Sequence, residues 1–165
     1  MPISSASVLA PVAAAYGWQD CQCQPLPTPG PAPDPARLLQ AFIQSAPGWV
    51  DGLMRLRDRI VAPLGLKTAA SAPFVPDGPL QVGTRVGVFR ILQLAPHELV
   101  LGEDDRHLDF RISLLWQPGA LHISTLVRPH NLAGRAYLAL VTPWHHLIAQ
   151  TMARRMVRGL ERGAC

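Results

Sequence analysis

The sequence predicts an α+β fold in which a curved antiparallel sheet wraps around a long C-terminal helix. Between residues 85 and 128, apolar and polar side chains alternate with the period of two that is typical of strands. From Asn131 to about Arg162 the apolar residues recur instead at helical spacing. An amphipathic helix of that length must bury its apolar stripe, and the sheet is the surface available to it.

Composition and charge limit the class of protein. The chain has 165 residues, of which 48% are hydrophobic and 16% charged. This length and composition fit one globular domain. No apolar run approaches the roughly 18 residues that a membrane span needs. The apolar stretch at residues 7–15 has no Lys or Arg before it, so we expect no signal peptide and a cytoplasmic protein.

The N-terminal part is expected to be irregular. Residues 1–15 are small and uncharged and have no period, which predicts a poorly ordered arm. A single domain is expected over residues 16–162, and it begins with a strand over residues 16–26. Prolines then alternate through residues 25–35, and such a segment should form a stiff, extended connector inside the domain.

A short helical hairpin should follow the connector. Asp34 is suited to the N-cap of the first helix, and Pro35 to its first position. This helix should end before Pro47. A second helix is expected over residues 49–62, with an apolar stripe formed by Trp49, Leu53, Leu56 and Ile60. Residues 67–82 should form a loop.

The sheet is expected to be an antiparallel meander with short turns. Its strands are predicted over Arg85–Leu94, Glu98–Gly102, Arg106–Gln117 and Ala120–Arg128. The third of these should place Leu108, Phe110, Ile112, Leu114 and Trp116 on one face. Its other face should carry His107, Asp109, Arg111 and Ser113. Pro143 interrupts the C-terminal helix, so we expect a kink or a restart there, and Thr142 before it favours the restart.

This order of elements is that of the helix-grip, or START-like, fold, in which a cavity lies between sheet and helix. Particular motifs add a resemblance. They are Trp49-Val-Asp, Leu56-Arg-Asp, Leu64-Gly-Leu-Lys, Gly83-x-x-x-Gly-x-Phe, Glu98-Leu-Val-Leu-Gly-x-Asp-Asp-x-His-Leu-Asp-Phe-Arg, Ser124-Thr, His130-Asn, Gly134-Arg-x-Tyr and Pro143-Trp-His. Together they resemble the bacterial family catalogued as domain of unknown function 2867, grouped with START-like (SRPBCC) proteins, over about residues 16–160. The resemblance implies a fold and a cavity and no particular reaction.

The densest run of ionisable residues, Gly102 to Arg111, contains the first candidate site. Asp109 and Arg111 lie two apart on a strand, so their side chains share a face. They could anchor a ligand in the cavity, with Arg111 holding an anionic group. They could instead form a structural ion pair that fixes the sheet against the helix. His107, on the same face, is a further ligand-binding candidate.

A second candidate site lies where the last strand meets the long helix. His130 precedes Asn131, a suitable N-cap. Gly134 could admit another backbone or a ligand, and Arg135 could reinforce an anion site at the helix N-terminus. His130, Asn131, Arg135 and Tyr137 are therefore ligand-binding candidates. A helix start packed on a loop would use the same residues.

Other kinds of site are not expected. His145 and His146 are adjacent and should point about 100° apart on a helix, so we predict no metal site from them. Cys21, Cys23 and Cys165 form neither a disulfide framework nor a four-ligand zinc site. The arginines near the C-terminus indicate a solvated helix face rather than a nucleic-acid surface. Signatures of nucleophilic enzymes, phosphate loops and dinucleotide sites are absent from the sequence.

Three hypotheses for function follow. The leading one is a domain that binds a small, largely apolar molecule between sheet and helix, without cofactor, nucleic acid or membrane. The second is an enzyme of cyclase, dehydratase or hydrolase type that uses the same cavity; it requires Asp109 or His107 to face that cavity. The third is a non-catalytic interaction module, for which a homo-oligomer is plausible because the chain is apolar and weakly charged.

Overall fold

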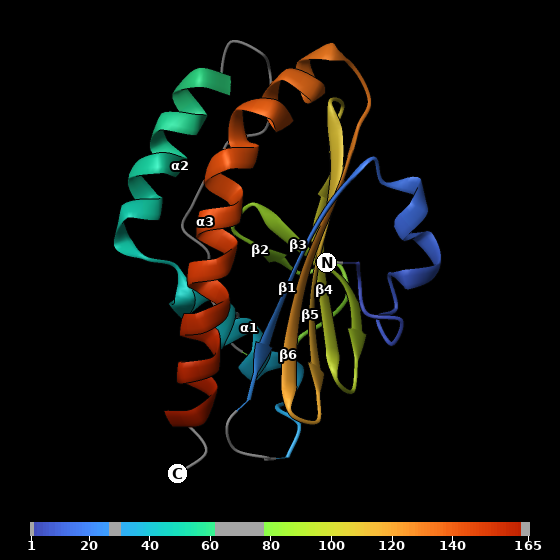
Figure 1. Ribbon diagram of the computed structural model, residues 1–165, viewed down its shortest axis with the longest axis vertical. Helices are drawn as coiled ribbons and strands as arrows, with labels where there is room; N and C mark the ends of the chain where they lie inside the picture. The colour runs from blue at the N-terminus through green and yellow to red at the C-terminus, as the bar shows by residue number, and fades with distance from the viewer. Residues whose placement is uncertain (1, 27–30, 62–77, 163–165) are drawn as a thin grey trace.

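The chain folds around one antiparallel sheet, shown by a computed structural model that describes residues 2–26, 31–61 and 78–162 (Figure 1). Six strands are hydrogen-bonded in the order β1-β6-β5-β4-β3-β2. They are β1 (Trp18–Pro25), β2 (Arg85–Val86), β3 (Phe89–Ala95), β4 (Glu98–Asp104), β5 (Leu108–Gln117) and β6 (Ala120–Pro129). The helices are the 3-10 helix η1 (Ala10–Ala15) and the α-helices α1 (Pro35–Ser45), α2 (Gly48–Val61) and α3 (Leu132–Arg162). The predicted α+β architecture, a curved sheet with a long C-terminal helix, is confirmed and is consistent with a helix-grip fold.

Each strand sends alternate side chains to two different cores. On the helix side of the sheet, which α1 and α3 cover, Leu99, Leu101 and Leu114 pack with Met156 of α3. On the opposite, outer side, Val100 and Leu126 pack with Leu9, Ala13 and Tyr16. Figure 1 shows the α-helices on one side of the sheet and the N-terminal segment on the other.

The N-terminal segment was predicted to be poorly ordered, but it packs against the sheet. Leu9, Ala13 and Tyr16 are buried against the outer side of the sheet. The hydroxyl of Ser7 donates to Glu98 Oε1 over 2.6 Å, and the backbone N–H of Val8 donates to Glu98 Oε2 over 2.8 Å. A few small apolar residues are sufficient to cover this face, and they need no regular period to do so.

The helical hairpin is present with the predicted start. Asp34 is the N-cap of α1, and its Oδ1 accepts a 2.7 Å hydrogen bond from the backbone N–H of Arg37. The helix buries Leu38, Leu39 and Phe42. Of the predicted features, the side chains of Leu53 and Ile60, residues 27–30 of the connector and residues 62–77, with most of the predicted loop, lie outside the described residues.

The single strand predicted over residues 85–94 is wrong. It is a hairpin of β2 and β3, in which Arg85 pairs with Arg90 and Val86 with Phe89. Gly87 turns the chain with a φ of 63°, in the left-handed region that glycine tolerates. The apolar alternation continues across this turn, which explains why periodicity did not reveal it.

The restart predicted at Pro143 is also wrong, because α3 runs continuously from Leu132 to Arg162. Proline removes one backbone donor from a helix. The hydroxyl of Thr142 donates to the carbonyl oxygen of Leu138 over 2.6 Å, so Thr142 bonds back into the helix instead of capping a new one. The first turns of α3 incline away from the axis of its remainder (Figure 1), so the helix bends rather than restarts.

Candidate functional site

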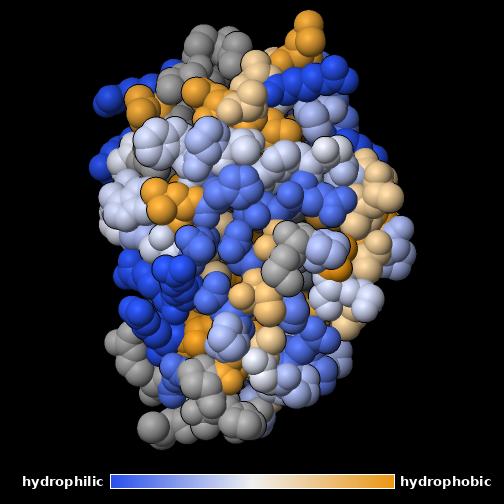
Figure 2. All heavy atoms as spheres, in the orientation of Figure 1, coloured by the Kyte–Doolittle hydropathy of each residue, from blue (hydrophilic) through white to orange (hydrophobic). Residues whose placement is uncertain are grey.

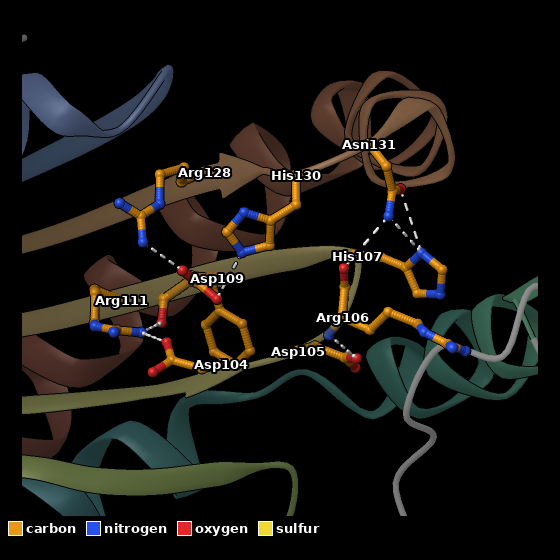
Figure 3. Close-up of polar contacts among 10 residues, drawn as sticks. Asp104, Asp105, Arg106, His107, Asp109, Arg111, Arg128, His130 and Asn131 are labelled. Atoms are coloured by element: carbon orange, nitrogen blue, oxygen red, sulfur yellow. Dashed lines mark hydrogen bonds and ion pairs between the residues drawn. The ribbon is translucent and has the colours of Figure 1, made fainter.

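Asp109 is the centre of a polar group at the end of β5 and β6 (Figure 3). Its carboxylate is buried. Arg128 Nη2 lies 2.7 Å from Asp109 Oδ2, and His130 Nε2 lies 2.9 Å from Asp109 Oδ1. Asp109 is the register partner of Arg128 across the sheet, which explains why these two side chains meet.

The charge of Asp109 is stabilised by its two partners. Burial alone would raise the pKa of this carboxyl. The hydrogen bonds from His130 and Arg128 outweigh burial, and the pKa of Asp109 lies below its ordinary value. The carboxylate is therefore ionised near neutral pH, and each of its oxygens has a partner, Arg128 or His130.

Arg111 pairs with Asp104 rather than with Asp109. Its Nη1 lies 2.6 Å from Asp104 Oδ1 (Figure 3). Diagonal neighbours on adjacent strands are separated by roughly 7–8 Å, which a long arginine side chain can span. Arg111 lies opposite Gly102 on β4, two residues from Asp104. The ion pair considered from the sequence is thus replaced by two cross-strand pairs.

All of these groups lie on the outer side of the sheet. The guanidinium carbons of Arg111 and Arg128 lie 6.0 and 5.7 Å from the centre of the Tyr16 ring. Tyr16 belongs to the outer core. Asp109 and Arg111 therefore face away from α3 and from any space between the sheet and that helix. Of the two residues that the enzyme hypothesis could use, Asp109 therefore does not face the cavity.

The remaining predicted residues surround the start of α3. Asn131 is the N-cap, as predicted, because its Oδ1 accepts a 3.0 Å hydrogen bond from the backbone N–H of Gly134. The Asn131 amide also contacts His107 Nδ1, with the nitrogen atoms 3.1 Å apart (Figure 3). A Cβ at Gly134 would collide with the carbonyl oxygen of His107. The close approach at Gly134 is thus made by the backbone, and this region is a helix start packed on a loop.

Arg135 and Tyr137 are not brought together with the Asp109 group. Arg135 is exposed on the first turn of α3, and its backbone N–H bonds the Asn131 carbonyl. Tyr137 is half-buried two residues further along. The seven predicted site residues therefore divide between the outer side of the sheet and the N-terminal turns of α3.

A different polar group lies beneath α3, on the helix side of the sheet. Asp20 of β1 is buried, with 8% of its surface exposed. His145 Nε2 lies 3.4 Å from Asp20 Oδ2, and His146 Nδ1 lies 3.3 Å from Asp20 Oδ1. Gln22 Nε2 donates to Asp20 Oδ1 over 3.1 Å. We call Asp20, His145 and His146 the Asp20 cluster.

The surroundings of His145 in the Asp20 cluster lower the pKa of its imidazole. Its Nε2 is buried and has no hydrogen-bond partner among the described residues, because the contact with Asp20 lacks hydrogen-bond geometry. Burial lowers the pKa of His145, the charge of Asp20 acts in the opposite direction, and His146 lowers it further. A buried polar nitrogen without a partner costs free energy, so it favours a group that can complete it.

Apolar side chains lie next to the Asp20 cluster on the helix side of the sheet. The Trp18 ring meets the His145 ring edge to face, with centroids 5.0 Å apart. Phe89 and Phe110, 6.0 Å apart, are only half-buried although they lie on the helix side. Ile112 is likewise half-buried. This face therefore combines accessible apolar surface with a few convergent polar groups.

Sequence reasoning missed the Asp20 cluster. His145 and His146 both reach one carboxylate, because one uses Nε2 and the other Nδ1. The alternation of Trp18, Asp20 and Gln22 along β1 was the available signal. It identifies a shared face but not the helix that covers it.

Residues that could take part in other chemistry also occur in the described part of the chain. No group of three or more His, Cys, Asp or Glu side chains there has an arrangement that could hold a metal ion. Cys21 and Cys23 of β1 are free thiols. Among the described helices, none is both long and apolar enough to span a membrane.

Comparison with known proteins gives one family. No significant match to a curated protein or to a solved structure was found. The profile of the family described as "Protein of unknown function (DUF2867)" matches residues 12–152, which include every strand of the sheet and the Asp20 cluster. The chain therefore belongs to the DUF2867 family.

Proposed function

We propose that the protein binds a small, largely apolar molecule between the sheet and the N-terminal half of α3, as a START-like domain. The observation that carries the proposal is the buried Nε2 of His145, which lacks a hydrogen-bond partner among the described residues and lies beside Asp20. Ligand sites typically combine apolar walls with a small number of polar groups that fix orientation. Here Trp18 and Phe110 would supply the walls.

The location follows from how α3 packs. In its C-terminal half, Ala153 and Met156 are fully buried against the sheet and α1, which leaves no room for a ligand. Toward the N-terminal half, Phe110 and Ile112 on the same side of the sheet are half-buried. The ligand is therefore proposed to occupy the part of the helix side that α1 does not cover.

The Asp20 cluster would orient such a molecule. Asp20 pairs with both histidines and accepts a hydrogen bond from the Gln22 amide. These contacts hold its carboxylate in place. The lowered pKa of His145 keeps its imidazole neutral near neutral pH. A neutral imidazole can accept or donate one hydrogen bond, which suits a ligand hydroxyl or carbonyl group.

The experiment is native mass spectrometry of the protein purified from the organism that expresses it. We expect a retained compound, released on denaturation, whose loss lowers the melting temperature. The variant Ile112→Trp should retain less of it, because the larger side chain occupies the proposed space. A wild-type protein that carries no compound and is not stabilised by added apolar molecules would overturn the proposal.

A second candidate function is an enzyme that uses the same site. It is favoured by the Asp20–His145 pair, because a buried carboxylate beside a half-buried imidazole is an arrangement used for proton transfer. The compound released from the wild type distinguishes the two functions. Chemical conversion of that compound by the wild type, and not by Asp20→Asn, would favour the enzyme, whereas its unchanged return would favour binding.

The partners and location predicted from the sequence remain proposals. We propose from composition alone that the protein binds neither nucleic acid nor membranes and that it is cytoplasmic. A homo-oligomer is supported by Leu140, Trp144 and Leu147 of α3, which lie on one face of the helix and are 49%, 54% and 51% exposed. Light scattering that shows a monomer at all concentrations would exclude the oligomer.

A further inference from the structure

A groove runs between α1 and the C-terminal turns of α3, away from the Asp20 cluster. Its volume is about 540 Å³, within the range of small-molecule sites. Arg37, Gln40 and Gln44 line it from α1, and Arg155, Arg158 and Gly159 line it from α3. The α1 residues recur at spacings of three and four, so they form one polar face, opposite the buried Leu38 and Leu39.

The groove is strongly cationic. None of the described residues that line it is acidic, and three are arginines. Figure 2 shows strongly hydrophilic side chains gathered over the C-terminal half of α3 on the viewed face. Arg155 is exposed and makes no ion pair or side-chain hydrogen bond within the described part of the chain. Its charge is therefore available to a ligand.

Helix dipoles do not account for all these arginines. Cations near the C-terminus of α3 are favoured by its dipole. Arg37, however, lies in the first turn of α1, where the dipole of its own helix disfavours a cation. Its Nη2 donates to the carbonyl oxygen of Leu160 over 2.8 Å, which fixes the guanidinium at one end of the groove. This bond uses one of the five donors of the guanidinium.

Gly159 borders open space in the groove. A Cβ placed there would meet nothing within 4 Å, so no neighbouring side chain fills the space that it leaves. Glycine costs helix stability relative to alanine. Packing therefore does not require a glycine at position 159, where α3 lines the groove.

We infer that this groove binds a small, soluble phosphorylated molecule through Arg37 and Arg155. Guanidinium groups form paired, charge-assisted hydrogen bonds with phosphate oxygens, and the amides of Gln40 and Gln44 add further donors. The groove is separate from the site of the proposed apolar ligand, so either site can exist without the other.

The test is titration calorimetry of the full chain with inorganic pyrophosphate, against sodium chloride at matched ionic strength. We expect saturable binding that Arg155→Gln weakens by about tenfold or more. Arg154→Gln removes a neighbouring exposed charge that does not line the groove, and should change the affinity less than about twofold. Gly159→Leu keeps every charge but fills the groove, and should abolish binding while the melting temperature is maintained.

Three results would overturn the inference. One is pyrophosphate binding no stronger than the chloride control. Another is equal weakening by Arg154→Gln and Arg155→Gln with no effect of Gly159→Leu, which would indicate a diffuse surface charge. The third is binding to vesicles of phosphatidic acid and phosphatidylcholine without binding of pyrophosphate, which would assign the groove to a lipid headgroup.

Discussion

The imidazole of His145 on α3 faces the carboxylate of Asp20 on β1, with 3.4 Å between Nε2 and Oδ2. This contact joins an edge strand of the sheet to the long helix and places two ionisable groups on the side of the sheet where a helix-grip fold can hold a ligand. The Asp109 group, which is richer in charge, lies on the opposite side under Tyr16. The two sides of the sheet thus present different polar groups, with Asp109 and its cationic partners on the outer side and the Asp20 cluster on the helix side.

The burial of His145 predicts a dependence of stability on pH. Its pKa in the folded protein lies below the ordinary value of about 6.5. Between those two values the unfolded chain takes up a proton that the folded protein does not, so the free energy of unfolding falls as the pH falls below about 6.5. In the variant His145→Asn, the free energy of unfolding should fall less between pH 7 and pH 5, as measured by denaturation at each pH. His97→Asn, which alters an exposed side chain, should keep the wild-type slope. Equal slopes for His145→Asn and the wild type would contradict the assignment.

The ion pairs of Asp109 should likewise stabilise the fold at neutral pH and not in acid. The pKa of Asp109 is lowered, so its contribution is complete above the ordinary value near 3.8 and is lost as the pH falls through the folded-state pKa. Asp109→Asn should cost about 2 kcal/mol of unfolding free energy at pH 7 and less at pH 3. Asp104→Asn, at a side chain that is 65% exposed, should cost less than about 1 kcal/mol. Equal losses in urea denaturation would show that burial of Asp109 is unimportant.

The attachment of the N-terminal segment should depend on Ser7. The Ser7 hydroxyl is buried and bonds Glu98, which also accepts a 2.5 Å hydrogen bond from Ser113. Ser7→Ala should lower the unfolding free energy by about 2 kcal/mol and speed hydrogen exchange in residues 2–15. Ser4→Ala removes a more exposed hydroxyl, and its effect should stay within about 0.5 kcal/mol. If exchange in this segment is already complete in the wild type, the packing of the segment on the sheet is refuted.

Gly134 should tolerate no side chain. A Cβ there would collide with the carbonyl oxygen of His107, so Gly134→Ala must displace the start of α3 or the loop before β5. We expect a loss of about 2 kcal/mol or more in thermal or urea denaturation. Gly52→Ala in α2 meets nothing within 4 Å and should be neutral or stabilising, by up to about 1 kcal/mol. A neutral Gly134→Ala would mean that the helix does not approach His107 as described.

Much of the fold could be predicted because local signals were strong. The alternation along β5 assigned Ile112 and Leu114 to one face and Asp109 and Arg111 to the other, as observed. The N-caps Asp34 and Asn131 were identified from residue type and position. Each of these features is determined by residues within a few positions of one another.

The site could not be predicted in the same way, because it depends on which face of the sheet the long helix covers. Both faces of β5 contain buried residues, since Leu114 packs under α1 and α3 while Ser113 is buried under the N-terminal segment. Alternation cannot distinguish these two covers. The contact of Asp20 with His145 joins the first strand to the last helix, and no local pattern encodes it.

The central claim is that a ligand lies between the sheet and α3 and is oriented by His145. Native mass spectrometry of paired histidine variants, purified from the same host as the wild type, tests it most directly. His145→Ala removes an imidazole from the helix side, and His130→Ala removes one from the outer side. The account predicts that the wild type and His130→Ala retain the same compound and that His145→Ala loses it. Full retention by His145→Ala, or loss by His130→Ala alone, would contradict the account.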